Sequence, residues 1–95
     1  MKMDPEMAMS QISEILNELA EDTSVPRNIR RGAQEAASKW LLDRTKPIDV
    51  RVFSAIKILD DLADDPNIPM HARTMIYNII TQLETVNREM EESNS

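Results

Sequence analysis

Apolar residues recur at helical spacing in four stretches of this chain, and prolines separate the stretches. In the first stretch the spacing is three or four residues, with acidic residues between: Ala8, Ile12, Ile15, Leu16 and Leu19 alternate with Glu14, Glu18 and Glu21. Such spacing gathers the apolar residues on one face of a helix. The whole pattern predicts helices at about residues 5–22, 26–44, 48–64 and 69–90.

The predicted helix boundaries follow the prolines. Asp4 and Pro5 are typical of a helix start. Pro26 stops the first helix, since it lacks a donor, and it suits the first turn of the second. Ser24 is the candidate N-cap of the second helix, and Asn67 takes the same place before the fourth.

The apolar faces of the later helices differ in width. The second is thin, because Gly32 and three alanines allow a neighbouring helix to approach closely, while Trp40 fills its wider end. The fourth has the spacing of a heptad seam. The residues expected to face inward are Ile29, Ala33, Ala36, Ala37, Trp40 and Leu41, then Val52, Ala55, Ile56, Leu59, Leu62 and Ala63, and finally Ala72, Ile76, Ile79, Leu83, Val86 and Met90.

The two halves of the chain are copies of one pattern. At an offset of 43 residues the identical positions are Ile15, Leu16, Leu19, Ala20, Asp22, Pro26 and Arg30, which match Ile58, Leu59, Leu62, Ala63, Asp65, Pro69 and Arg73. A repeat of this period is an architectural signal. It predicts two helical hairpins in a single domain of residues 1–95: hairpin one at about 5–44, a link at 45–47, hairpin two at about 48–90 and a loose tail at 91–95.

Composition supports an all-α fold in one domain. The chain has 95 residues, 41% of them hydrophobic, with one glycine and 3% aromatic residues. So few glycines leave little for the turns of a β fold. Cysteine is absent, which excludes disulfides and thiol chemistry, and no apolar run reaches the roughly 18 residues of a membrane span. We expect a soluble cytoplasmic protein.

Each half resembles a HEAT-type helical repeat, in which an apolar helix is followed by an aspartate, a short turn, a proline and an arginine. The stretch 10–88 also resembles a small archaeal family of uncharacterised helical-bundle proteins, and residues 22–31 and 65–74 carry that likeness. The resemblances imply an all-α, four-helix array of two HEAT-like helical hairpins with internal pseudo-symmetry. They imply an archaeal, cytoplasmic origin and supply no activity.

Charge is unevenly distributed along the chain. The net charge is −6, yet residues 23–47 carry +4. Arg27 and Arg31 lie four residues apart on one predicted helix face, so they repel each other. They also lie near a helix N-terminus, where the dipole disfavours cations. Such a breach of local rules is typical of functional sites, so Arg27, Arg31 and Lys39 are the candidate partner-binding residues.

A structural interpretation of the same charges stays open. The acidic residues at the end of the first helix could neutralise Arg27 and Arg31 across the turn. Arg30 and Arg73 follow the repeat, and HEAT-like units often join an aspartate to such an arginine. We therefore predict a structural role in the two turns for Asp22, Pro26 and Arg30 and for Asp65, Pro69 and Arg73.

The sequence contains few groups that support catalysis. A single glycine cannot form a phosphate-binding loop, and a single histidine, His71, cannot supply a helical di-iron site. We expect His71 to be a surface or turn residue. The acidic clusters of the first and third helices are expected to be solvated faces rather than cation sites. The sequence therefore predicts no enzyme, no cofactor, no metal and no catalytic residue.

Two functional hypotheses remain. The first is a non-catalytic protein-interaction or assembly module whose partner is an unknown protein or a second copy of the chain; the heptad seam of the fourth helix favours the second copy. The alternative is a nucleic-acid- or phosphate-binding accessory protein that uses Arg27, Arg31, Lys39, Arg44 and Lys46. The sequence does not decide between them.

Overall fold

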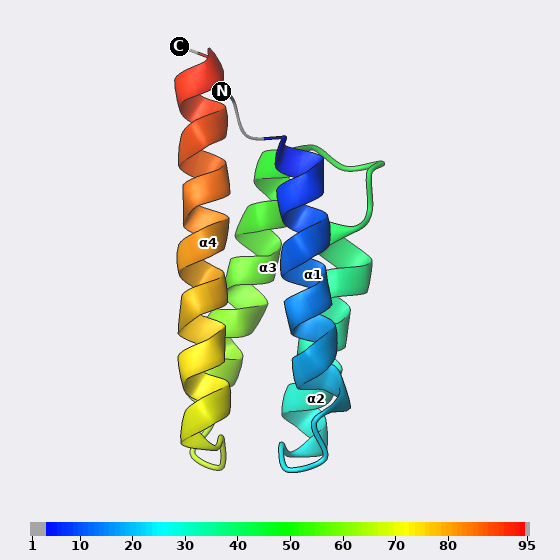
Figure 1. Cartoon of the computed structure of the whole chain (residues 1–95), viewed down its shortest axis with the longest axis vertical. Helices are drawn as coiled ribbons and strands as arrows, with labels where there is room; N and C mark the ends of the chain where they lie inside the picture. Colours follow the sequence, from blue (N-terminus) through cyan, green and yellow to red (C-terminus); the bar gives the residue numbers. More distant parts are fainter. Residues whose placement is uncertain (1–3, 95) are drawn as a thin grey trace.

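The computed structural model describes residues 4–94, which form an antiparallel helical bundle without strands (Figure 1). The second helix has two parts, an α-helical part and a π-helical part named η1. The elements are α1 at Pro5–Glu21, α2 at Arg27–Glu35, η1 at Ala36–Leu41, α3 at Ile48–Ala63 and α4 at Met70–Asn94. The all-α prediction is confirmed. No helix within the described residues is long and apolar enough to cross a membrane.

The start of α1 is the predicted one. Asp4 is its N-cap, and Pro5 occupies the first turn. Asp4 Oδ1 accepts a hydrogen bond from the backbone N–H of Glu6 at 3.0 Å and a longer one from Met7 at 3.4 Å. A cap of this kind stabilises a helix by about 1 kcal/mol.

The predicted caps of the second and fourth helices are wrong. Pro26 stands at the N-cap of α2, which has no side-chain cap. The hydroxyl of Ser24 donates instead to Asp22 Oδ1 at 2.6 Å. Asn67 lies in the turn before α4, where its N–H donates to Asp65 Oδ1 at 2.8 Å. Both residues belong to turns organised by the preceding aspartate, which is the stronger local acceptor.

The second helix changes its hydrogen-bonding pattern after Glu35, which the apolar spacing did not predict. Ala36–Leu41 is a π-helix, and the N–H of Leu42 bonds the carbonyl of Ala37, five residues earlier, at 3.0 Å. The helix ends at Leu41 rather than at residue 44. Asp43 then holds the link, because its Oδ1 accepts the N–H of Thr45 at 3.0 Å.

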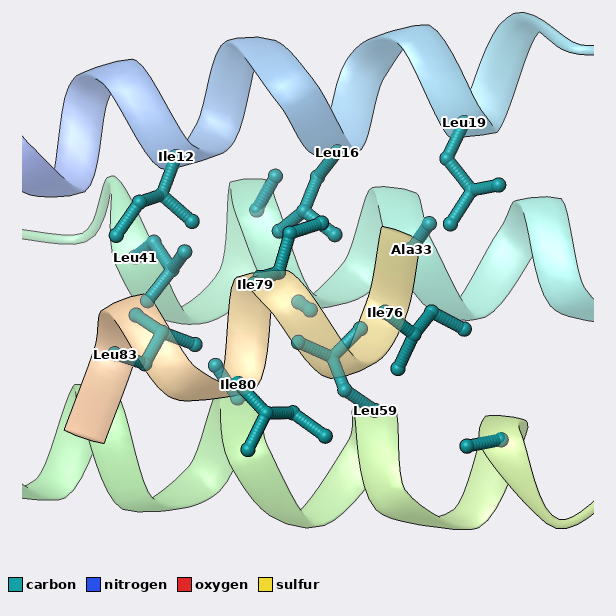
Figure 2. Close-up of a cluster of buried hydrophobic side chains, with 14 of the residues drawn as sticks. Ile12, Leu16, Leu19, Ala33, Leu41, Leu59, Ile76, Ile79, Ile80 and Leu83 are labelled. Atoms are coloured by element: carbon teal, nitrogen blue, oxygen red, sulfur yellow. The ribbon is translucent and has the colours of Figure 1, made fainter. Parts of the chain in front are cut away.

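The core lies between all the helices and is built from the predicted apolar faces (Figure 2). Ile56, Leu62 and Trp40 pack on its border and are only partly buried. The thin face of α2 works as predicted: a Cβ added to Gly32 would lie 2.7 Å from Leu62 Cδ1, so α2 and α3 approach closely there. The remaining buried apolar residues include Met9, Val25 and Ile68.

The heptad seam of α4 faces this core. Ile76, Ile79 and Leu83 are fully buried, and Met90 is half-buried. A seam that is already covered is not available to a second copy, so the expected route to self-association through α4 is wrong. The helix itself is longer than predicted, because Glu91 and Glu92 continue it to Asn94 in place of the loose tail. Ser95 lies outside the described residues.

The helices form a ring in which sequence neighbours also neighbour in space. α1 packs against α4 and against the second helix, and α3 packs against the same two (Figure 1). The equivalent helices, α1 and α3, are therefore not the principal neighbours of each other. Repeats that stack on one another would bring equivalent helices side by side. HEAT-like stacking is thus not confirmed, and the packing is that of a four-helix bundle.

Candidate functional site

The two turns at one end of the bundle have the same backbone geometry. Asp22 Oδ1 accepts the N–H of Ser24 at 2.9 Å, and Asp65 Oδ1 accepts that of Asn67 at 2.8 Å. In each turn the aspartate carbonyl also accepts the N–H three residues on, at 3.1 Å and 3.2 Å. Each aspartate therefore fixes its own turn with one carboxylate oxygen.

The other carboxylate oxygen of each aspartate reaches the opposite hairpin. Asp22 Oδ2 lies 2.9 Å from His71 Nε2, at the start of α4. Asp65 Oδ2 accepts a hydrogen bond from Asn28 Nδ2, at the start of α2, at 2.7 Å. Asn28 and His71 are 43 residues apart, like the two aspartates. The contact is reciprocal, as in a two-fold symmetric interface, so the hairpins meet as an approximate dimer within one chain.

These hydrogen bonds stabilise the charged carboxylates. The Ser24 hydroxyl, followed by His71 and the Ser24 N–H, lowers the pKa of Asp22 to about 2. The N–H of Asn67, together with the Asn28 amide, lowers the pKa of Asp65 below its usual value. Both aspartates are thus ionised acceptors throughout the neutral range.

The cluster of Asp22, Ser24 and His71 lacks the geometry of a catalytic triad. Ser24 Oγ lies 3.4 Å from His71 Nε2, the same nitrogen that contacts Asp22. A triad needs the carboxylate on one ring nitrogen and the nucleophile on the other. His71 is half-exposed and lies at the turn, as predicted.

The repeated arginines bind backbone carbonyls, not aspartates. Arg30 Nε donates to the carbonyl of Val25 at 3.0 Å. Arg73 Nε donates to Ala63 O at 3.1 Å, with a weak contact to Asp65 O at 3.5 Å. The expected Asp–Arg pairs are therefore wrong. Ala63 is the last residue of α3, and a helix end leaves carbonyls without partners, which Arg73 satisfies. Val25 lies in the turn before α2, where Arg30 satisfies its carbonyl.

Arg27 and Arg31 are brought together on the surface of α2, beside the turn. With Ala20, Arg30 and Gln34 they line a shallow hollow of about 230 Å³. Both side chains are exposed, and within residues 4–94 neither makes an ion pair or a hydrogen bond. The neutralising contacts with the acidic end of α1 are thus not formed. We name this surface, Arg27, Arg30 and Arg31, the arginine face.

Lys39 lies apart from the arginine face, on η1. Its Nζ is 3.8 Å from Glu35 Oε1 and 5.7 Å from the centre of the Trp40 ring. Lys46 also lies over that ring, at 4.9 Å, and pairs with Asp43 at 2.6 Å. The structure therefore does not join Lys39 to the two arginines.

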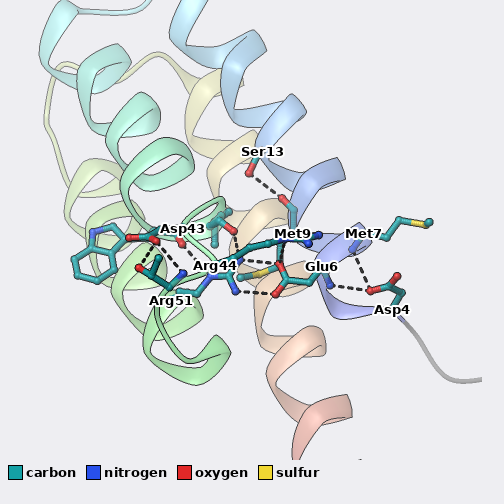
Figure 3. Close-up of polar contacts among 11 residues, drawn as sticks. Asp4, Glu6, Met7, Met9, Ser13, Asp43, Arg44 and Arg51 are labelled. Atoms are coloured by element: carbon teal, nitrogen blue, oxygen red, sulfur yellow. Dashed lines mark hydrogen bonds and ion pairs between the residues drawn. The ribbon is translucent and has the colours of Figure 1, made fainter.

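A buried arginine at the opposite end of the bundle is the largest feature that sequence reasoning missed (Figure 3). Arg51 is 1% exposed, and its two terminal nitrogens each donate to a carboxylate oxygen of Glu6 at 2.8 Å. It also donates to the carbonyls of Trp40 and Leu41 at the end of η1. The hydrogen bonds from Arg51 lower the pKa of Glu6. The signal was present, because Arg51 stands four residues before Ala55 on the inward stripe.

Acidic side chains do not converge on a common point in the part of the chain that the structure describes. No group of three or more His, Asp or Glu residues there is arranged to hold a metal ion. The acidic residues of α1 and α3 that were considered as cation ligands are mostly exposed.

Fold and surface together define a small all-helical bundle with an apolar core and polar contacts between its helices at both ends. The model of the uncharacterised protein family UPF0147 matches residues 1–86, and the chain belongs to this family. A relative from Methanothermobacter thermautotrophicus is 46% identical over 77 residues, which cover 81% of this chain and 74% of that protein. One from Methanocaldococcus jannaschii is 44% identical, covering 86% and 87%. The relatives confirm the predicted resemblance to an uncharacterised archaeal family.

Two solved structures share the fold. A crystal structure of a protein of unknown function is 44% identical, covers 90% of this chain and 96% of that one, and superposes with a TM-score of 0.83. A UPF0147 protein from Thermoplasma acidophilum is 37% identical, covers 83% and 92%, and has a TM-score of 0.79. The family itself is of unknown function.

Proposed function

We propose that this protein is a non-catalytic interaction module that binds an acidic segment of another protein on its arginine face. The observation that carries the proposal is the exposure of Arg27 and Arg31 without a partner in the described structure. Two like charges four residues apart near a helix N-terminus destabilise that helix. An internal ion pair would relieve the cost, and none forms within residues 4–94; an acidic ligand relieves it instead.

The geometry of the arginine face supports this use. Arg30 is anchored to the carbonyl of Val25, which fixes one edge of the hollow. Arg27 and Arg31 are free to present their planar guanidinium groups, which bind carboxylates through two parallel hydrogen bonds. Gln34 at the rim adds an amide donor. Lys39 is left out of the proposed site, because Glu35 already pairs with it.

A phosphate-rich ligand is the second candidate, and one observation favours it. Lys39 and Lys46 lie over the ring of Trp40, so the structure does place cations beside an aromatic residue. Stacking on such rings is common in single-strand binding. The same arginines near the start of α2 also suit a phosphate. The net charge of −6 opposes it, since nucleic acid is repelled by the rest of the surface.

The test is a titration of the labelled full chain, followed by amide NMR, with an oligoglutamate peptide and separately with a single-stranded oligonucleotide. We expect the peptide to shift the amides of residues 27–34 and Arg27→Glu/Arg31→Glu to abolish the shifts. Lys39→Glu/Arg88→Glu carries the same change in net charge outside the arginine face and is expected to bind the peptide as the wild type does. Pull-downs with the same variants then identify the natural partner.

Each outcome has a definite meaning. If the oligonucleotide binds and the peptide does not, the phosphate-binding role replaces the proposed one. Binding of the peptide that survives in Arg27→Glu/Arg31→Glu would remove the arginine face from the proposal. Absence of shifts with either probe at low salt, where charge attraction is strongest, would contradict both candidates.

A further inference from the structure

The outer face of α3 carries the most exposed aromatic residue of the described chain. Phe53 is 69% exposed, and Val50, one turn earlier, is 43% exposed. Aromatic side chains bury a large area on contact and are enriched at interfaces, whereas they gain nothing in water. The α3 face is defined here as Asp49, Val50, Phe53 and Lys57.

Phe53 stands as a ridge between two hollows. Towards η1 it borders a hollow of about 290 Å³ together with Trp40 and Ile58. Towards α4 it borders one of about 370 Å³ together with Val50 and Asn87. α3 packs against both of these neighbours. A ridge beside a hollow is the shape that a second identical ridge can fill.

The charges of the α3 face are arranged symmetrically about Phe53. Asp49 lies four residues before it and Lys57 four residues after it, both exposed. Neither makes an ion pair within residues 4–94, and the carboxylate of Asp49 contacts only the N–H of Val50, at 3.0 Å. When two copies of α3 pack antiparallel about an axis at Phe53, each Lys57 faces Asp49 of the other copy. A parallel arrangement would instead oppose identical charges.

We propose that a second copy of this chain docks antiparallel on the α3 face, with Phe53 of each copy in the hollow beside Phe53 of the other. The match is self-complementary, since the same residues supply both sides of every contact, as a two-fold dimer requires. The acidic end of α3, at Asp60, Asp61 and Asp64, then lies near the N-terminus of the other α3, where the helix dipole is positive. This contact is independent of the arginine face.

A single helix face gives a weak dimer. α3 has 16 residues, hence a length of about 24 Å, and the buried area falls at the low end of specific interfaces. The experiment is sedimentation equilibrium of the full chain from about 10 µM to about 1 mM. We expect the average mass to rise from 10.9 kDa towards twice that value over this range.

Reversing the charge of Lys57 or Asp49 tests whether these residues face each other in the antiparallel pair of α3 helices. Lys57→Asp and Asp49→Lys each place like charges opposite one another, so each variant alone is expected to need at least a tenfold higher concentration to dimerise. An equimolar mixture of the two restores both attractive pairs and is expected to dimerise as the wild type does. Arg88→Asp and Glu14→Lys change the net charge by the same amounts at exposed positions of α4 and α1, and are expected to dimerise normally.

Phe53→Ala tests the apolar centre. The variant is expected to stay monomeric and to keep the wild-type circular dichroism spectrum, because Phe53 is largely exposed. A monomeric wild type at about 1 mM would overturn the proposal. So would dimers that tolerate either single charge variant, or a mixture of the two that remains monomeric.

Discussion

The two ends of the bundle are held together in different ways. At the turn end, short side chains make exposed, reciprocal contacts between the hairpins: Asp22 with His71, and Asp65 with Asn28. At the opposite end a single buried arginine, Arg51, joins three helical elements. The first solution follows the internal repeat. The second breaks it, since the residue 43 positions before Arg51 is Ala8.

The difference teaches where stability is concentrated. On folding, exposed polar groups only exchange hydrogen bonds with water for hydrogen bonds and ion pairs within the protein. Such contacts therefore contribute little to the free energy of unfolding. A buried charge has no water to bind if its partner is lost. Removing the partner of a buried charge therefore destabilises the fold strongly. We therefore expect the turn end to tolerate single substitutions. The end that contains Arg51 is expected not to tolerate them.

The largest effect is expected when Glu6 is removed. Glu6→Ala leaves the guanidinium of Arg51 buried with only backbone carbonyls as acceptors. We expect a loss of about 2–3 kcal/mol, at the lower end for a broken buried pair because water reaches the site of Glu6, whose side chain is 27% exposed. Urea denaturation followed by circular dichroism measures it.

The double variant Glu6→Leu/Arg51→Met distinguishes the loss of the ionic partner of Arg51 from the loss of side-chain packing. With no charge left to bury, we expect it to recover most of the loss seen in Glu6→Ala. The carbonyls of Trp40 and Leu41 then lack a donor, so recovery stays incomplete. A double variant less stable than Glu6→Ala would show that Arg51 acts through its own packing.

Acid is expected to weaken the Glu6–Arg51 pair, which gives the second largest effect. The pKa of Glu6 is lowered from 4.5 in the folded state, mainly by the hydrogen bonds from Arg51. A lowered pKa means that the pair contributes fully above about pH 4.5 and that its contribution is lost as the pH falls through the folded-state value. We expect the midpoint of urea unfolding to fall more steeply with acid in the wild type than in Glu6→Leu/Arg51→Met. Equal slopes would contradict the assignment.

Substitutions at the turn end test whether the two turns are equivalent. Asp22→Asn and Asp65→Asn remove equivalent carboxylates and are expected to cost similar amounts, each less than half the loss of Glu6→Ala, because both sites are exposed to water. In the wild type the contribution of Asp22 is present above pH 4 and is lost as the pH falls towards its pKa of about 2. Thermal melts at pH 7 and pH 2.5 check both statements. Markedly unequal losses would contradict the reciprocal contact.

How far the sequence predicts this molecule follows from the same comparison. Helical periodicity and proline positions predict the helices, and the repeat locates both turns correctly. The repeat did not say which groups meet, because contacts between Asp22 and His71 or Asp65 and Asn28 depend on how the hairpins pack. The π-helical segment is a tertiary effect, which local patterns do not encode. Arg51 lies on the inward stripe of α3, but the stripe does not show that Glu6 and the carbonyls of η1 are its partners. The exposure of Arg27 and Arg31 likewise needed the structure.

The smallest effect is expected from a change that makes the two turns more alike. His71→Asn gives the second hairpin the residue that Asn28 supplies in the first, and its amide is expected to donate to Asp22 as Asn28 donates to Asp65. Stability should stay close to that of the wild type, while His71→Ala, which has no donor, should lose more. If His71→Asn were as damaging as His71→Ala, the imidazole would have a role that its contact with Asp22 does not explain, and the equivalence of the two turns would end at their backbones. Thermal melts of the three proteins side by side decide it.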